Sequence, residues 1–505
     1  MKSKGSITVF LSFVLVFVTG LFFTFSEVLR FYCLKGQSAR SAALACESTL
    51  SEYCRPLWED YGILAVDGGY GEEQFRKDLY ERKLSQYMEL NGTSEGVHFF
   101  QAYTREAALS SYTLLTDGRA SGLIREAAIM TKDSIPETAL KEAAGLADRT
   151  AAAGDSPDIS ELLGSGRKAM DAAKKKRDKS GEEAPLPEGL QDLPTVAGKE
   201  PDEATKKRLE DAGDPVKTVS AVDADGILGL VLPRGSKVSG EYFQSASRPG
   251  TRSLSRGNGA VMKANAGDTL LFRFWMLNDL QNYTKSLGHK GLQYEAEYIV
   301  CGASSDRENL KGTVNRILAL REASNLASLV RDPVKVGQAE ALAIVLAGPT
   351  ANPAIIAAIK AAIIASWSYC ESVMDLRRLL AGGKVAVVKT PADWTSQLYQ
   401  IASILSGEQM ARESAAGMSY GGFLFSLLLL TDRDKSALRA CDIMEEAVHR
   451  VRGYGNVRMD NMLVAVNTSE IYQADPLFLS FVLIFTGEAG AYDFPYTESM
   501  SYLGG

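Results

Sequence analysis

The stretch ITVFLSFVLVFVTGLFFTF, residues 7–25, decides how this chain is organised. It contains no charged side chain, and Phe, Leu, Val and Ile dominate it. At a rise of about 1.5 Å per residue, a helix of this length matches a hydrocarbon core about 30 Å thick. We therefore predict one transmembrane helix. It includes the apolar residues Ile7, Phe10, Val14, Phe17, Leu21 and Phe25.

The charges on either side of this stretch predict its orientation. Lys2 and Lys4 precede it, whereas Glu27 and Arg30 follow it and roughly cancel each other. Because positive charge stays on the cytoplasmic side, we expect a single-pass protein of the cell membrane with a cytoplasmic N-terminus and an extracellular bulk. A cleaved secretory signal is the alternative, but the apolar run is longer than the usual about 7–15 residues, and no small-x-small site precedes residues 38–42.

The helix is expected to continue beyond the membrane. Small and apolar residues recur every three or four positions after the apolar run, which is typical of a helical stripe. They are Leu29, Cys33, Gly36, Ala39, Ala43, Cys46, Leu50, Tyr53 and Leu57. This pattern predicts one helix from about residue 7 to about residue 55, roughly 70 Å long, which Pro56 and Gly62 end. Half would lie in lipid and half would pack on a soluble domain.

The remaining sequence predicts an α+β fold with a mixed helix and antiparallel-sheet region, then a mostly helical C-terminal part with closing strands. Strands are expected at 61–67, 97–115, 292–302, 384–389, 459–472 and 478–485. Helices are expected at 72–90, 120–153, 270–283, 338–346, 354–380, 394–406, 421–430 and 434–451, and after the capping box formed by Ser305 and Glu308. The apolar start of 354–380 is short and carries Lys360, so it predicts a core helix rather than a second span.

A composition break divides the chain. No Phe, Tyr or Trp occurs between Tyr112 and Tyr242, and 154–215 is rich in charge and Pro. Such a segment buries too little apolar surface to offset its chain entropy, so we interpret it as an exposed or disordered linker. The expected divisions are 1–26 for the tail and transmembrane helix, 27–153 for a pilin-like helix with strands and helices, 154–215 for the linker, and 216–505 for a large α+β extracytoplasmic domain.

Bulk composition narrows the class of protein. The 505 residues are 46% hydrophobic and 23% charged, an ordinary globular mix, and the net charge of −7 gives no basic field for nucleic acid. The six cysteines form no CxxC motif, and two interpretations stay open: apolar packing, or one or two extracellular disulfides. They are Cys33, Cys46, Cys54, Cys301, Cys370 and Cys441.

Residue patterns for catalysis are weak. The histidines, His98, His289 and His449, have no ligand-spaced partners and are expected at surfaces or interfaces, so we predict no metal site and no cofactor. Residues 417–421 match G-x-S-x-G, but the expected strand before Ser419 is missing. Ser419 is better explained as a helix N-cap, and we expect no catalytic residue and no enzyme.

The N-terminal stretch KGSITVFLSFVLVFVTGLFFTFSEVLRFYCLKGQSARSAALACE, residues 4–47, resembles the start of TadE/TadG-like proteins of tight-adherence (Flp) pilus systems. Further stretches resemble a poorly characterised bacterial family, a domain of unknown function that carries the same N-terminus. These are YGILAVD (61–67), LLFRFWMLNDLQNYT (270–284), LQYEAEYIVCG (292–302), ENLKGTVNRILALREASN (308–325), LLAGGKVAVVKT (379–390) and YGGFLFSLLLL (420–430).

The resemblance implies a non-catalytic, membrane-anchored, pseudopilin-like component of a pilus or secretion apparatus. Its partners would be the lipid bilayer and other membrane proteins of that system. Prepilins are cut after Gly, which makes Gly5 and Ser6 the candidate processing site, and they carry Glu at the fifth mature position. Phe10 stands there instead, and Glu27 lies too far along the helix to replace it. This departure favours a permanently anchored accessory protein.

Two other functions stay open from the sequence. One is a surface adhesin or sensor ectodomain unconnected to pili. The other is a serine hydrolase that uses Ser419.

Overall fold

The computed structural model describes residues 4–92, 98–136, 168, 202–211, 213–222, 226–347, 353–479 and 490–503. The chain folds into two compact units, each built from separate segments. Unit 1 comprises Met1–Asp133, Ser245–Phe272 and Ala440–Gly505, and unit 2 comprises Ser134–Gln244 and Arg273–Arg439. The α+β class and the long apolar N-terminal helix are confirmed.

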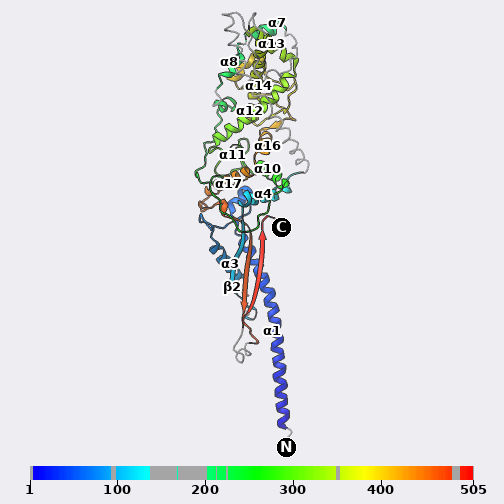
Figure 1. Ribbon diagram of the computed structural model, residues 1–505, viewed down its shortest axis with the longest axis vertical. Coiled ribbons are helices and arrows are strands. Elements are labelled where there is room, and N and C mark those ends of the chain that lie inside the picture. Colours follow the sequence, from blue (N-terminus) through cyan, green and yellow to red (C-terminus); the bar gives the residue numbers. More distant parts are fainter. Residues whose placement is uncertain are drawn as a thin grey trace. The chain divides into compact units, whose positions relative to one another are not determined.

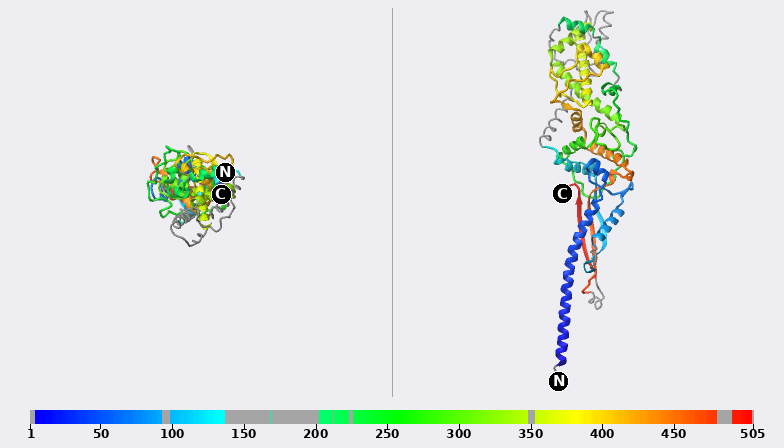
Figure 2. Two further views of the ribbon diagram at one scale, coloured as in Figure 1. Left: turned by 90° about the horizontal axis from the view of Figure 1, so that it is seen from above. Right: turned by 180° about the vertical axis from the view of Figure 1, so that it is seen from behind.

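Helix α1 comprises Lys4–Leu50. It ends five residues before residue 55, where the sequence predicted its end. Pro56 does not terminate it. Instead, Pro56 lies in the first turn of a separate helix, α2 (Arg55–Tyr61), where a missing N–H leaves no hydrogen bond unmade. Gly62 ends α2 in the left-handed region, with φ 67°. The second half of α1 lies beside the strands of unit 1, and its first half extends beyond them (Figures 1 and 2).

The buried face of α1 differs from the expected stripe, since Leu29, Cys33 and Gly36 are exposed. The buried residues are Glu27, Arg30, Leu34, Ser38, Ser41, Ala42, Ala45, Cys46, Thr49 and Leu50. Half of these residues are polar. Ser41 and Thr49 can be buried because their hydroxyls donate hydrogen bonds to backbone carbonyls. Ser41 donates to Asn91 O at 3.0 Å, and Thr49 donates to Cys46 O at 2.7 Å. Apolar periodicity could not identify this face because half of it is polar.

Four strands form the sheet of unit 1. The central strand, β5 (Met462–Ala474), pairs antiparallel with β2 (Tyr103–Leu114), with β6 (Tyr492–Ser501) and with the short β1 (Val66–Asp67). The strands expected at 97–115 and 459–472 are therefore confirmed. The expected strand at 478–485 is not seen at 478–479, and its remainder lies outside the described residues. The sheet is closed by β6, which the sequence did not predict.

Helices α1 and α3 (Lys77–Gly92) cover the sheet and build the core of unit 1. This core includes Leu34, Ala42, Ala45, Cys46, Tyr80, Leu84, Met88, Leu109, Leu114, Val466, Tyr472 and Phe494. Helix α4 (Asp117–Lys132) confirms the first part of the helix expected at 120–153, and 137–153 lies outside the described part of the chain.

Unit 2 is mainly helical, and its central helix is α14 (Pro353–Leu380), most of whose residues are buried. Around it lie α8 (Pro215–Ser220), α9 (Ile227–Val231), α12 (Asp306–Val330), α13 (Pro333–Ala347) and α15 (Ile401–Ser406). The other helices of unit 2 are α7 (Glu203–Asp211), α11 (Glu295–Cys301) and α16 (Tyr420–Leu430). Helices α10 (Ala266–Asp279) and α17 (Arg433–His449) each contribute residues to both units. Two-residue strands β3 (Lys384–Val385) and β4 (Met418–Ser419) pair antiparallel.

The strand expected at 292–302 is wrong, because this stretch forms helix α11, which ends at Gly302 with φ 75°. Apolar and polar residues alternate in this sequence, but the polar residues are not exposed to solvent. Glu295 and Glu297 are both fully buried, and their carboxylates accept backbone N–H groups of Gln281 and Tyr283 at 2.9 Å. Buried acids at alternate positions therefore imitated the pattern of a half-exposed strand.

Within the expected linker 154–215, residues 203–211 form helix α7, and its Leu209 is buried. Helix α8 begins at the last residue of this range and continues to Ser220. The side chain of Asp214 caps α8 by accepting the N–H of Lys217 at 3.0 Å. Of residues 154–201, the structure describes only Lys168. The helix expected at 394–406 forms only as a short 3-10 turn at Leu398–Gln400 followed by α15.

Candidate functional site

The feature that best defines a site in unit 1 is a buried ion pair on α1, at the boundary between its exposed and packed halves. Arg30 Nη1 lies 3.0 Å from Glu27 Oε1, and the two side chains are 6% and 2% exposed. The residues are one helical turn apart, so they project from the same face. Both side chains point into the protein although they stand directly after the apolar run.

Each member of the pair binds backbone groups of two distant segments. Glu27 Oε2 accepts the N–H of Leu477 at 3.1 Å and of Phe478 at 2.6 Å. Arg30 donates to Phe99 O at 2.6 Å and to Asp475 O at 2.8 Å. We call these segments, residues 98–102 before β2 and 475–479 after β5, the sheet tip. The ion pair thus ties α1 to the sheet tip through main-chain groups.

Aromatic rings extend this connection toward the N-terminus of α1. The ring of Phe478 stacks on Phe23 with centroids 6.2 Å apart, and on Phe99 with centroids 5.8 Å apart. Phe23 precedes Glu27 by about one turn, so the sheet tip reaches past the ion pair along the apolar helix.

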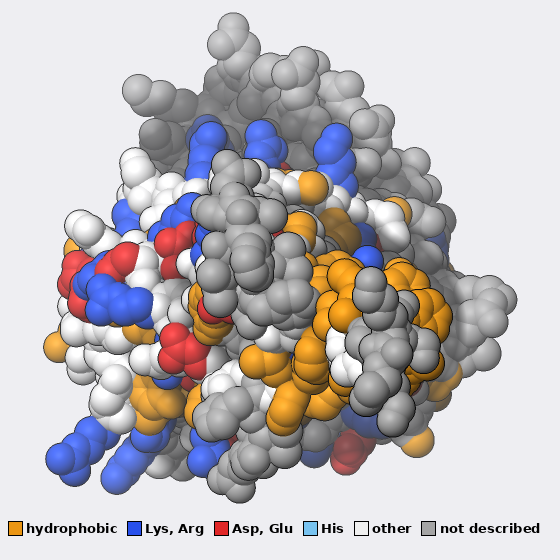
Figure 3. All heavy atoms as spheres, turned by 90° about the horizontal axis from the view of Figure 1, so that it is seen from below, with side chains coloured by type: hydrophobic (Ala, Val, Ile, Leu, Met, Phe, Trp, Pro, Cys, Tyr) orange, Lys and Arg blue, Asp and Glu red, His pale blue; other side chains and the backbone are white. Residues whose placement is uncertain are grey.

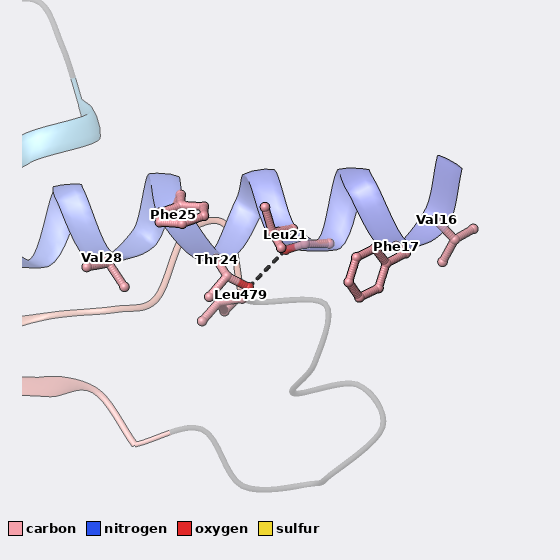
Figure 4. A pocket seen from close by; sticks show the side chains of 8 residues that line it. Val16, Phe17, Leu21, Thr24, Phe25, Val28 and Leu479 are labelled. Carbon is pink, nitrogen blue, oxygen red and sulfur yellow. Dashed lines mark hydrogen bonds between the residues drawn. The ribbon is translucent and has the colours of Figure 1, made fainter. Parts of the chain in front are cut away.

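Next to this stack, α1 and Leu479 line an open apolar groove of about 660 Å³. Its walls are Val16, Phe17, Gly20, Leu21, Thr24, Phe25, Val28 and Leu479 (Figure 4). The one hydroxyl among them, on Thr24, donates to Gly20 O at 2.9 Å. With no charged wall residue, the groove offers apolar contact rather than acid–base chemistry.

The first half of α1 is exposed and apolar, and it includes the transmembrane residues expected from the sequence. Seen from below, hydrophobic side chains gather at this end of the helix (Figure 3). Its polar side chains are satisfied internally, since Ser12 and Thr19 donate to carbonyls four residues earlier. The stretch beginning at Ile7 has a mean hydropathy of 2.4 and no buried residue in its most apolar window, as in a membrane anchor or a signal sequence.

By the same length and composition, α14 also passes as a candidate span, but 67% of its most apolar window is buried within unit 2. That burial supports the expected core helix. A charge cluster also lies between α12 and α14: Arg321 Nε binds Asp375 Oδ2 at 3.0 Å, and Lys389 Nζ binds Asp375 Oδ1 at 2.6 Å and pairs with Glu371. Two cations face two acids, so this buried cluster is internally paired.

Ser419, His449 and His289 have structural contacts, whereas the side chain of His98 lies outside the described part of the structure. Ser419 caps α16, as expected, by accepting the N–H of Gly422 at 3.4 Å, and only the two-residue β4 precedes that helix. His449 Nε2 lies 2.6 Å from Val457 O. His289 is buried, not at a surface, and its Nδ1 lies 2.9 Å from Glu295 Oε2. Gly5 lies in the first turn of α1.

The cysteines form no disulfide among the described residues. All six cysteines lie in described regions and are free thiols there, with Cys33 exposed and Cys46, Cys54, Cys370 and Cys441 buried. For the four buried cysteines this favours apolar packing over the disulfide alternative. Within the part of the chain that the structure describes, no group of three His, Cys, Asp or Glu side chains is placed to hold a metal ion.

Sequence reasoning missed the role of Glu27 and Arg30, which it treated as flanking charges. The available signal was an opposite pair at i and i+3 directly after an uncharged helix. Nothing in the local sequence pointed to Phe99, Asp475 or Phe478, because their connection to α1 is made by the fold.

The fold and this site define an α+β protein with a candidate N-terminal membrane anchor. Residues 205–474 match the family of unknown function DUF5702, and because the match covers more than half of the chain, the chain belongs to that family. Residues 1–204 lie outside the match. Comparisons with curated proteins and with solved structures found no match.

Proposed function

We propose that this chain is a single-pass, non-catalytic accessory anchor of a tight-adherence pilus or related secretion apparatus. The N-terminus is cytoplasmic and the folded units are extracellular. The observation that carries the proposal is α1 itself: one continuous helix whose first half is apolar and exposed and whose second half is packed in the core of unit 1. This division is shared with pilin-like proteins.

The first acidic residue of α1, Glu27, supports an accessory anchor over a fibre subunit. A polymerising pilin uses a free Glu near its N-terminus to neutralise a neighbouring amine. Phe10 occupies that place here, and Glu27, the first acid of the chain, is already engaged by Arg30 and by two backbone N–H groups. The carboxylate is therefore not available to a neighbouring chain.

The outward face of α1 supports contact with partner proteins beyond the membrane. Leu29 and Tyr32 are each 66% exposed, and Cys33 is exposed beside them. Exposed apolar residues grouped on one helix face are typical of a surface that packs against another protein.

Crosslinking through Cys33 tests this function. A photoactivatable thiol reagent attached to Cys33 in native membranes is expected to capture membrane proteins of the pilus or secretion system. Cys33→Ser is the matched control, because the remaining thiols are buried or half-buried. Capture of no such protein in membranes that contain the assembled system would favour the alternative, an adhesin or sensor ectodomain unconnected to pili.

A further inference from the structure

We propose that the sheet tip enters the outer leaflet and contacts lipid acyl chains, which gives the protein a second membrane contact beside α1. This inference rests on the proposed anchoring of α1. The partner is the hydrocarbon of the bilayer, and the contact is made by the apolar side chains of residues 98–102 and 475–479.

The depth of the sheet tip along α1 is the first argument. Residues 5–26 carry no charge, and at about 1.5 Å per residue they span about 33 Å, the thickness of a hydrocarbon core. Glu27 therefore marks the outer boundary. Leu479 lines the groove together with Thr24 and Gly20, which lie about 5 and 10 Å from Glu27 along the helix. Interfacial protein segments enter the bilayer by about 5–10 Å, so a shallow insertion of Leu479 agrees with this range.

The main chain of the sheet tip is the second argument. A backbone that leaves water must have its N–H and C=O groups satisfied by the protein. At the boundary, Glu27 accepts two N–H groups, of Leu477 and Phe478, and Arg30 satisfies two carbonyls, of Phe99 and Asp475. Water would satisfy all four groups if the tip were solvated. The buried ion pair thus supplies partners to four backbone groups that would lose their hydrogen bonds on entering hydrocarbon.

The side chains of the sheet tip are the third argument. Phe99 and Leu477 are 47% and 43% exposed, and Phe100 is also exposed. Phe99 is joined to the apolar half of α1 through the stack of Phe99 on Phe478 and of Phe478 on Phe23. Apolar groups next to a membrane-spanning helix are stabilised by lipid contact, whereas in water the same exposure is unfavourable.

Tryptophan scanning with brominated lipids tests the insertion. Full-length Leu479→Trp and Phe99→Trp, one from each segment of the tip, are reconstituted in phosphatidylcholine vesicles with bromine on the acyl chains. The wild-type chain supplies the baseline, because its tryptophans Trp58, Trp275, Trp367 and Trp394 all lie outside α1 and the tip. Phe13→Trp is the reference within the span, and Leu44→Trp, exposed far beyond Glu27, is the reference in water.

We expect the added emission of both tip variants to be quenched to an extent comparable to Phe13→Trp, while Leu44→Trp is not quenched. If Phe13→Trp is quenched but both tip variants behave like Leu44→Trp, the insertion is wrong and the anchor stands. A blue-shifted but unquenched tip signal also overturns the proposal, because protein rather than lipid then covers the tip. Loss of quenching at Phe13→Trp would overturn the anchoring itself.

Discussion

At the scale of single residues, charged side chains that look like ordinary flanking groups hold unit 1 together. Arg30 pairs with Glu27 and binds carbonyls of two segments, and both side chains are buried. Removing one member of a buried pair leaves an uncompensated charge, which is far more unfavourable than losing a solvated pair.

Arg30→Ala is expected to lower the free energy of unfolding of unit 1 by about 3–5 kcal/mol, because Glu27 then stays buried without its cation. The matched control is Arg55→Ala, which breaks a solvent-exposed pair with Glu59 at 2.8 Å and should change stability by about 0–1 kcal/mol. Urea unfolding of the detergent-solubilised chain, with hydrogen exchange of β5 peptides as the local readout, checks both. Equal effects of the two changes would contradict the assigned role of the pair.

A second residue-scale prediction concerns Glu470, which is buried in β5. Burial raises the pKa of Glu470 from 4.5 to about 7, and the carboxylate of Glu498 adds to the shift. Between these values the folded chain holds a proton that the unfolded chain has lost, so this group makes stability fall as pH rises from about 4.5 to about 7.

Glu470→Gln removes this titration and should flatten the pH dependence of the free energy of unfolding. At pH 8 the variant should therefore be more stable than the wild type by about 1–3 kcal/mol, given about 1.4 kcal/mol per pKa unit. Hydrogen exchange of β5, compared between the two proteins at pH 5 and again at pH 8, measures the difference. Glu106→Gln, an exposed acid on the neighbouring strand β2, serves as the control and should leave the pH profile unchanged.

At the scale of elements, the second half of α1 packs closely because most residues of its buried face are small. Ala42 and Ala45 are fully buried in the core that α1 shares with α3 and the sheet. Residues this small leave no room for longer side chains in a close-packed core.

Ala45→Leu is therefore expected to destabilise unit 1 by about 1–3 kcal/mol through overpacking. Leu44→Ala, one position earlier on the exposed face, should stay within about 0.5 kcal/mol of the wild type. The measurement is the urea midpoint reported by β5 exchange. A neutral Ala45→Leu would mean that the contact between α1 and the core is looser than the burial indicates.

At the scale of the whole molecule, a permanent anchor requires an intact N-terminus. Because Phe10 replaces the acid of a polymerising pilin, we predict that the mature protein in native membranes keeps the sequence before Gly5. Mass spectrometry of the native N-terminal peptide measures this. A start at Ser6 would indicate prepilin-type processing, and a start near Ala45 would indicate a secreted protein without an anchor.

The sequence by itself determined the features that need no distant partner. The apolar run at 7–25 specifies an exposed apolar helix, and local signals placed the capping box of Ser305 and the N-cap of Ser419, because a helix and its caps depend on neighbouring residues. The class α+β and the core helix α14 followed from similarly local patterns.

Only the tertiary structure decided the role of the charges and the closure of the sheet. Arg30 and Asp475 are 445 positions apart, and no local pattern connects them. The buried acids of α11 also have partners outside their helix, and their alternation with apolar residues led to the wrong prediction of a strand. Strand β6 was not predicted, because it forms only by pairing with β5. A polar side chain is buried when the fold supplies its hydrogen-bond partners, and those partners come from segments that the chain brings together only on folding.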